Sequence, residues 1–212
     1  MVRIRISLMA VLLFFSFGSN AWADLKVVCS ISDYCALVKD IGGAKVDTRA
    51  LAVVGQDPHY VEPKPSYITQ LYRADLLISN GLELEIGWLP TLVLQARNTK
   101  IQKGAPGRLI VANHIRGFME VPTTKVDRSQ GDVHSGGNPH FYHDPLRMKE
   151  LIPVLVSRLS LLRPDDAAFF KKNGRVLITQ FEVLLEKERA RFSALPKGQR
   201  QLVTYHKSLS YL

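Results

Sequence analysis

Three histidines have the residue type and the surroundings that a metal site needs. His59 follows the apolar run 51–54 through a short polar loop, and His206 ends a second apolar run. His140 lies in the stretch 136–145, where glycine and proline keep the backbone out of regular structure. Ligands gather at the carboxyl ends of strands in an open α/β sheet, and three imidazoles converging there would supply three of the four ligands of a tetrahedral zinc site.

Two other histidines have weaker cases. His134 lies in the segment 121–138, which is rich in Gly, Ser, Thr and Asp, so we expect a solvated side chain on a surface loop. His114 directly follows a predicted strand, so we expect it to pack at the end of that strand.

The order of the apolar runs predicts an α/β fold. Strands are expected at 25–29, 46–54, 75–79 and 108–112. Helices are expected at 31–41, from a Ser66 cap through 72, at 82–97 with a break near Pro90, and at 145–162 after an Asp144 cap. Strands that alternate with helices at this spacing indicate a parallel four-stranded sheet with helices on both faces.

A long helix is predicted after this sheet. Apolar residues recur at helical spacing over 164–192, and Gly174 inside the pattern requires support from tertiary packing. A helix of this length exceeds what one small domain needs, so we expect it to connect two lobes. The predicted division is an N-terminal metal-binding lobe at 24–162, an inter-lobe helix at 163–195, and the start of a truncated C-terminal lobe at 196–212, opening with a strand at 201–205.

The first 23 residues predict export. Arg3 and Arg5 precede an apolar stretch of about a dozen residues, and Ala21-Trp22-Ala23 has the small-x-small pattern of a cleavage site. A bilayer-spanning helix needs roughly 20 apolar residues, so this segment is expected to be a cleaved signal peptide rather than an anchor. The mature chain would begin near Asp24 as a periplasmic protein.

The charge and the cysteines restrict the function further. Loss of two arginines with the signal peptide lowers the formal charge from +9 to +7, but Lys and Arg are scattered among acids, which disfavours nucleic-acid binding. Cys29 and Cys35 have a spacing that is poor for a metal pair. Either a disulfide or two buried thiols would fit an exported chain.

Several motifs together resemble one known family. They are Asp57-Pro58-His59 with Glu62-Pro63, Asn138-Pro139-His140 with Asp144-Pro145, the long helix, and Val203-Thr204-Tyr205-His206. These resemble the metal-binding solute-binding proteins of ABC importers, the zinc and manganese group. The resemblance implies two α/β lobes joined by a rigid helix, with a metal ion clamped between them and delivered to a membrane permease.

The resemblance also implies the ligands. His59 and His140 correspond to the ligands of the first lobe and His206 to the first ligand of the second, whereas the family's later carboxylate ligand has no counterpart here. His143 falls where the family has an apolar residue, so it is expected beside the site rather than on the metal. Glu62 is a candidate for orienting a ligand histidine through its second nitrogen.

Zinc is the expected metal. Neutral imidazole suits zinc, whereas manganese sites depend on carboxylate oxygen, and His206 stands where the manganese members carry Glu. The family's long His-rich loop is represented only by His134 with Asp127 and Asp132. Binding is expected to favour closure of the two lobes, and to weaken as the pH falls through about 6.5, because imidazoles must be neutral to bind.

Other hypotheses remain open at this point. A manganese-binding member of the same family is one. A hydrolase-like enzyme with zinc on three histidines and water is another, although no general base can be named and a non-enzyme is expected. A basic surface adhesin is the third. We expect a monomer, and a second lobe of about one strand would leave an apolar side of the long helix exposed.

Overall fold

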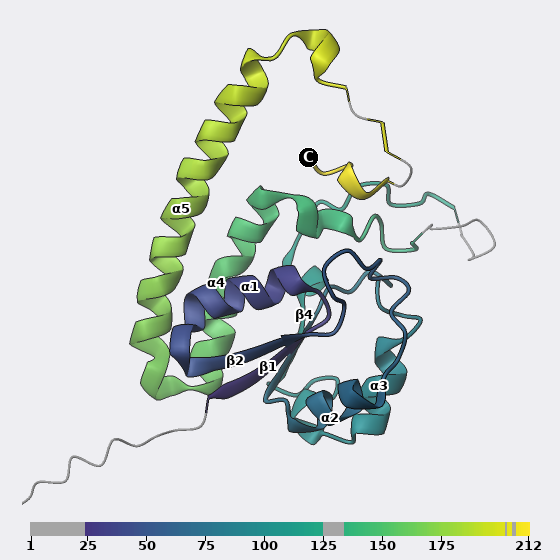
Figure 1. Ribbon diagram of the computed structural model, residues 1–212, viewed down its shortest axis with the longest axis vertical. Coiled ribbons are helices and arrows are strands. Elements are labelled where there is room, and N and C mark those ends of the chain that lie inside the picture. Colours follow the sequence, from purple (N-terminus) through teal and green to yellow (C-terminus); the bar gives the residue numbers. More distant parts are fainter. Residues whose placement is uncertain (1–23, 125–133, 202, 205–206) are drawn as a thin grey trace, which may run out of the picture.

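The computed structural model describes residues 24–124, 134–201, 203–204 and 207–212 (Figure 1). The predicted signal peptide at 1–23 and the candidate ligand His206 therefore lie outside the described residues. Within the described residues, no helix combines the length and the apolar character needed to cross a bilayer.

Four parallel strands form one sheet, as predicted. They are β1 (Leu25–Cys29), β2 (Val46–Ala50), β3 (Leu76–Ser79) and β4 (Arg108–Ile110), in the order β2-β1-β3-β4. In the central strand β1, Val27 pairs with Thr48 on one side and with Leu76 on the other. All four residues of β3 are buried, which explains why its apolar run was a clear signal.

The second and fourth strands are shorter than predicted. The amides of Leu51 and Ala52 still donate to the carbonyls of Cys29 and Ser30, but β2 ends at Ala50 and Val54 is almost fully exposed. Similarly, β4 gives way to a 3-10 helix at Val111–His114. The apolar residues beyond β2 therefore belong to a loop, and those beyond β4 to a 3-10 helix, both at the carboxyl edge of the sheet.

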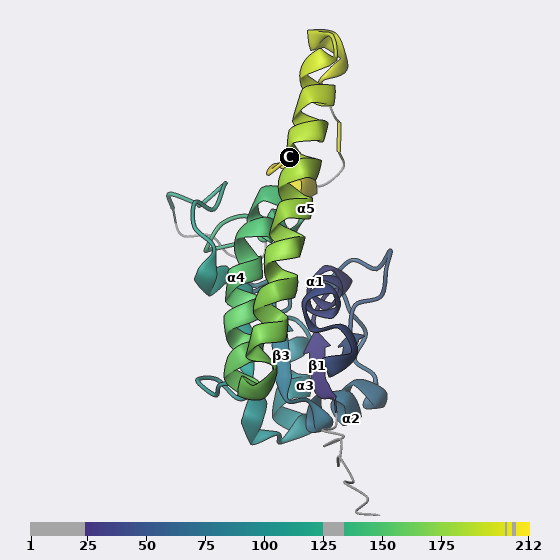
Figure 2. The ribbon, with the colours of Figure 1, turned by 90° about the vertical axis from the view of Figure 1, so that its left-hand side faces the viewer.

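Helices cover both faces of the sheet, as predicted. They are α1 (Ser32–Gly42), α2 (Pro65–Arg73), α3 (Leu89–Ala96), α4 (Pro145–Leu162) and α5 (Ala167–Ala194). The chain runs from β1 to β2 at one edge of the sheet, and then crosses β1 to reach β3 and β4. Because parallel crossovers are right-handed, this change of direction places α1 on one face and both α2 and α3 on the other. Helices α1, α4 and α5 pack together, and α2 packs on α3 (Figures 1 and 2).

Two local predictions were wrong. The segment 82–88 is not helical, because Leu82 and Glu83 have φ of 50° and 64°, in the left-handed region, and α3 begins only at Leu89. Ser66 does not cap α2, because Lys64 is the N-cap residue and makes no side-chain capping bond, while Pro65 takes the first helical position.

Helix α4 matches its prediction at both ends. The Asp144 side chain accepts a hydrogen bond from the Leu146 amide at 2.8 Å, as expected for an N-cap. Gly174 of α5 faces this helix so closely that a Cβ there would lie 2.5 Å from Val156. The absence of a side chain at Gly174 therefore allows α4 and α5 to approach closely. Their packing is the tertiary support that the sequence led us to expect for a helix with an internal glycine.

Helix α5 extends well past the sheet. Its 28 residues span about 42 Å at 1.5 Å per residue, and Figure 2 shows its C-terminal half standing clear of the other helices. The apolar side chains of Val183, Leu184 and Phe192 on this half are exposed. Gln201, Val203 and Thr204, the described residues of the predicted strand 201–205, belong to no strand.

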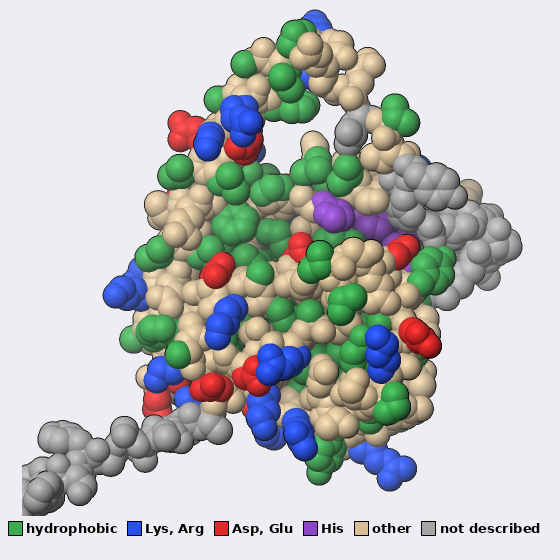
Figure 3. Space-filling view, in the orientation of Figure 1, with side chains coloured by type: hydrophobic (Ala, Val, Ile, Leu, Met, Phe, Trp, Pro, Cys, Tyr) green, Lys and Arg blue, Asp and Glu red, His purple; other side chains and the backbone are tan. Residues whose placement is uncertain are grey.

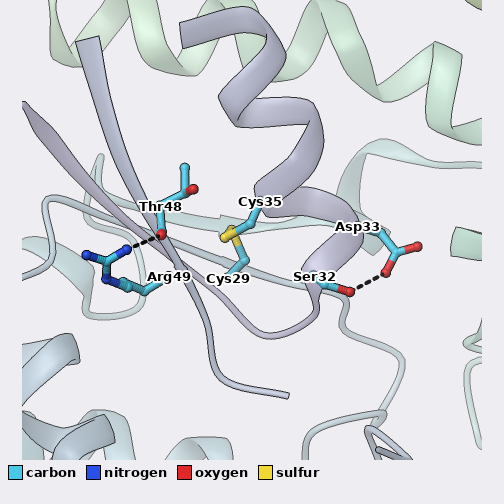
Figure 4. Close-up of a disulfide and its surroundings, with 6 residues drawn as sticks. All are labelled: Cys29, Ser32, Asp33, Cys35, Thr48 and Arg49. Carbon is cyan, nitrogen blue, oxygen red and sulfur yellow. Dashed lines mark hydrogen bonds between the residues drawn. A yellow bond between two sulfur atoms is a disulfide. The ribbon is translucent and has the colours of Figure 1, made fainter. Parts of the chain in front are cut away.

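The two cysteines form a disulfide between the end of β1 and the first turn of α1 (Figure 4). Their Cα atoms lie 5.7 Å apart, and both side chains are buried. The bridge closes a loop of a few residues at the carboxyl edge of the sheet. This settles the alternative that the sequence left open in favour of a disulfide.

Candidate metal site

The candidate site lies at the carboxyl edge of the sheet, where the direction of the chain reverses. Because β1 is followed by β2 on one side and β3 lies on the other, the loops after β1 and β3 diverge to opposite faces and leave a crevice. A groove of about 730 Å³ lies on this edge. Its lining includes Asp33, Asp57, His59, His140, His143 and Ser208. Figure 3 shows histidine side chains gathered on this side of the molecule, bordered by acidic side chains.

His59 and His140 are held by the same local geometry. Oδ1 of Asp57 accepts the His59 backbone amide at 2.9 Å and lies 2.8 Å from Nδ1 of the ring. Oδ1 of Asn138 does the same for His140, at 2.9 Å and 2.7 Å. In both cases a proline separates the two residues, so an Asx-turn fixes the backbone and the ring together. If Nδ1 carries the proton that it donates, Nε2 of each ring is the nitrogen that can bind a metal.

Asn138 has further contacts that involve the end of the chain. Its side-chain nitrogen donates to the Lys207 carbonyl at 2.8 Å and to Glu120 Oε2 at 3.3 Å. Its backbone carbonyl accepts from the Tyr211 hydroxyl at 2.7 Å, and that hydroxyl accepts from the Met119 amide at 2.9 Å. One residue therefore ties the His140 ring to the segment 207–211.

A buried polar network supports the His140 loop from the sheet. The side-chain nitrogen of Asn80, just after β3, donates to the Pro139 carbonyl at 3.0 Å, while the Tyr34 hydroxyl donates to Asn80 Oδ1. The Glu85 carboxylate accepts the Asn80 amide at 2.6 Å and the Gly81 amide at 3.1 Å. Burial raises the pKa of Glu85, against the effect of these hydrogen bonds.

The electrostatic surroundings suit a cation. Burial raises the pKa of Tyr142, and the negative charges of Asp33, Asp57 and Glu85 raise it further. These carboxylates therefore create a negative potential next to the groove, even though the whole chain is basic.

The structure brings His59 and His140 together and adds His134. The ring centroids of His59 and His140 are 5.1 Å apart. Nε2 of His59 lies 3.2 Å from Nε2 of His134, whose side chain is mostly buried, so the expectation of a solvated loop residue was wrong. Among the described residues, no three side chains of His, Cys, Asp or Glu already stand in the arrangement of a metal site.

Three other residues named from the sequence have different positions. His143 closes the 3-10 helix His140–His143 and lines the groove, and burial lowers its pKa while Asp33 opposes that effect. Glu62 is exposed, and Asp57 takes the orienting role that the sequence suggested for Glu62. His114 is exposed at the end of its 3-10 helix.

Sequence reasoning missed the roles of Asp57, Asn138 and His134. A signal for the first two was present, because Asx-Pro-His occurs twice and an Asx residue two positions before a histidine can accept from its backbone and its ring. No comparable signal existed for His134, whose approach to His59 joins segments 75 residues apart.

Comparison with known proteins identifies the family. Residues 27–212 match the family described as ZnuA, zinc-uptake complex component A, periplasmic. A manganese ABC transporter substrate-binding lipoprotein, PsaA, of Streptococcus mitis is 24% identical over 196 residues, which cover 88% of this chain and 58% of the relative. An iron ABC transporter substrate-binding lipoprotein, MtsA, of Streptococcus pyogenes serotype M1 is 26% identical over 191 residues, covering 88% and 57%.

Solved structures share the fold. A crystal structure of ZnuA aligns with a TM-score of 0.71 at 22% identity, covering 89% of this chain and 67% of that one. A manganese-bound periplasmic metal-binding protein from Candidatus Liberibacter asiaticus aligns with a TM-score of 0.69 at 22% identity, covering 87% and 63%. This chain thus spans a little under 60% of the length of the two curated relatives named above. On the strength of the match over residues 27–212, the chain belongs to the ZnuA family of periplasmic metal-binding proteins of ABC importers.

Proposed function

We propose that this protein captures a zinc ion outside the inner membrane and delivers it to an ABC-type importer. The observation that carries the proposal is the pair of Asx-Pro-His turns, which hold the His59 and His140 rings 5.1 Å apart with both Nδ1 atoms engaged. Two imidazoles oriented in this way present Nε2 to a shared ion. Family membership supports a substrate-binding protein rather than an enzyme, as expected from the sequence.

His206 is proposed as the third ligand. It lies outside the described residues, but the next two residues are at the site. The Lys207 carbonyl accepts from Asn138, and Ser208 lines the same groove as His59 and His140. A ligand at position 206 would therefore join the groove from the far end of the chain.

Zinc is proposed over manganese because the donors are nitrogen. Relatives are named for manganese and for iron, so the family alone does not select the metal. Manganese sites lean on carboxylate oxygen, whereas imidazole suits zinc, copper and nickel. The Asp57 carboxylate contacts Nδ1 of His59, and the charges of Asp33, Asp57 and Glu85 raise the pKa of Tyr142. These carboxylates therefore orient a ligand ring or add negative potential beside the groove.

The delivery mechanism is proposed from the same elements. We place the division between an N-terminal lobe at 24–162, a connecting helix at 163–195 and a second lobe from 196 onward. An ion that binds ligands on both sides favours the closed arrangement, because its affinity differs between open and closed forms. The protein is proposed to act as a monomer in the periplasm, after cleavage near Ala23, and to hand the ion to a membrane permease.

Native mass spectrometry of the purified chain tests this function. Zinc and manganese are offered together at equal concentration, and one bound zinc is expected. Replacement of His140 by alanine should abolish that binding, whereas replacement of the exposed His114 should leave it unchanged. Preference for manganese, or no metal bound by the folded wild-type chain, would contradict the proposal.

A further inference from the structure

We propose that His134 is an additional nitrogen ligand of the same ion and biases the site toward metals that prefer nitrogen. This inference rests on the proposed metal-binding function of His59 and His140 and extends it to a residue outside the three proposed ligands. It starts from the contact between Nε2 of His59 and Nε2 of His134.

The distance between these two nitrogens fits coordination. Zinc binds imidazole nitrogen at about 2.0–2.1 Å with tetrahedral angles, which places two ligand nitrogens ~3.3 Å apart. The observed separation is 3.2 Å. The two rings are nearly stacked, with centroids 5.2 Å apart and planes 28° apart, so neither ring needs to move far to share an ion.

The outer side of the His134 ring faces an acid. Nδ1 of His134 lies 4.0 Å from Oε2 of Glu83, which is too far for a hydrogen bond, whereas Oδ1 of Asp57 lies 2.8 Å from Nδ1 of His59. A carboxylate on Nδ1 favours the tautomer in which Nε2 carries the lone pair. An ion between the two rings requires a lone pair on both Nε2 atoms, which places the His134 proton on Nδ1, the side that faces Glu83.

The loop that carries His134 is anchored at this acid. The Ser135 hydroxyl donates to Glu83 Oε1 at 2.8 Å, and the Ser135 amide donates to Glu83 Oε2 at 3.3 Å. Glu83 and Leu82 both adopt left-handed backbone, which is costly for residues with a Cβ, and such strain persists where surrounding contacts enforce it. The strained turn after β3 therefore presents the acid to which His134 is docked.

The proposed ligand changes the donor set. His59, His134 and His140 would give three imidazoles from the first 140 residues, and metal binding would draw the His140 ring toward the other two. Because a site dominated by imidazole suits zinc better than manganese, His134 would act on selectivity as well as on affinity.

The test combines affinity with a count of ligands. Zinc and manganese affinities are measured by competition with a chromophoric chelator for the wild type and for His134→Ala, His59→Ala and His114→Ala. His134→Ala is expected to weaken zinc binding on the order of 100-fold and to weaken manganese binding less. His114→Ala, an exposed histidine outside the groove lining, is expected to match the wild type.

X-ray absorption of the zinc-loaded proteins counts the imidazoles directly. One imidazole fewer in His134→Ala than in the wild type is the expected result. An equal count in the two proteins, or unchanged zinc affinity in His134→Ala, would overturn the role of His134. Zinc binding by the wild type that is lost in His59→Ala supports the proposed function, whatever the result for His134. A wild type that does not bind zinc would contradict both proposals.

Discussion

The side-chain oxygen of Asn138 lies 2.7 Å from Nδ1 of His140 and 2.9 Å from the backbone amide of the same residue. The nitrogen of that side chain donates to the carbonyl of Lys207 at 2.8 Å. Asn138 thus orients one proposed ligand while it fixes the residue that follows another, His206. Outer contacts of this kind set both the tautomer and the direction of a ligating ring.

Replacing Asn138 by alanine is predicted to lower zinc affinity by about 10–100-fold, because the His140 ring loses the acceptor that orients it. Asn138→Asp keeps that acceptor but removes the donor to Lys207, so most of the affinity should return. Chelator competition measures both variants. Equal affinities for the alanine variant and the wild type would show that the ring is oriented by other contacts.

Removing the hydroxyl of Tyr211 is predicted to destabilise the fold by about 1–2 kcal/mol, because the Asn138 carbonyl loses a buried donor and the partly buried Met119 amide loses its acceptor. Urea denaturation of Tyr211→Phe measures the loss. Tyr72→Phe is the matched control, since Tyr72 is exposed on α2 and should change little. A Tyr211→Phe protein as stable as this control would speak against the anchoring of segment 207–211.

Reduction of the bridge between Cys29 and Cys35 is predicted to cost about 2 kcal/mol of stability, the value expected for closing a loop of this size in the unfolded chain. Urea midpoints with and without reductant measure it, after mass spectrometry has verified reduction. The double variant Cys29→Ala, Cys35→Ala should be insensitive to reductant. An unchanged midpoint for the fully reduced wild type would contradict the prediction.

The buried Glu85 is predicted to give a pH-dependent stability of definite sign. Burial raises its pKa in the folded state, so the folded chain binds more protons than the unfolded one between the two pKa values. Its contribution to stability is therefore largest at acidic pH, declines as the pH rises from about 4.3 through the raised value, and is constant above it. A tenfold difference in the proton affinity of this carboxylate between the folded and unfolded chain corresponds to about 1.4 kcal/mol.

Glu85→Gln isolates this effect, because glutamine keeps one acceptor oxygen and does not titrate. The unfolding free energy of the wild type minus that of the variant should fall between pH 4 and pH 8 in urea titrations. A difference that rises with pH would mean that the amides of Asn80 and Gly81 stabilise the ionised carboxylate more than burial disfavours it.

The sheet and its long helices were predictable because burial leaves a direct mark on the sequence. The continuous apolar run of β3 and the Asp144-Pro145 start of α4 are signals that depend only on neighbouring residues. The non-helical segment 82–88 was not predictable, since Leu82 and Glu83 adopt left-handed backbone that only tertiary contacts enforce.

Part of the candidate site was likewise predictable from the sequence, and part was not. The two Asx-Pro-His turns are local, so the sequence contains what fixes the rings of His59 and His140. The contact between His59 and His134 arises only when a turn after β3 meets a loop some 50 residues later, through Glu83 and Ser135. Spacing along the chain contains no information about such a tertiary contact, and for this reason the sequence predicts a solvated side chain at His134.

Anomalous diffraction at the zinc edge from crystals of the zinc-loaded protein tests the central claim most directly. One strong peak is expected at about 2.0–2.1 Å from Nε2 of both His59 and His140. A peak bound to other residues, with these two rings in place and uncoordinated, would contradict it.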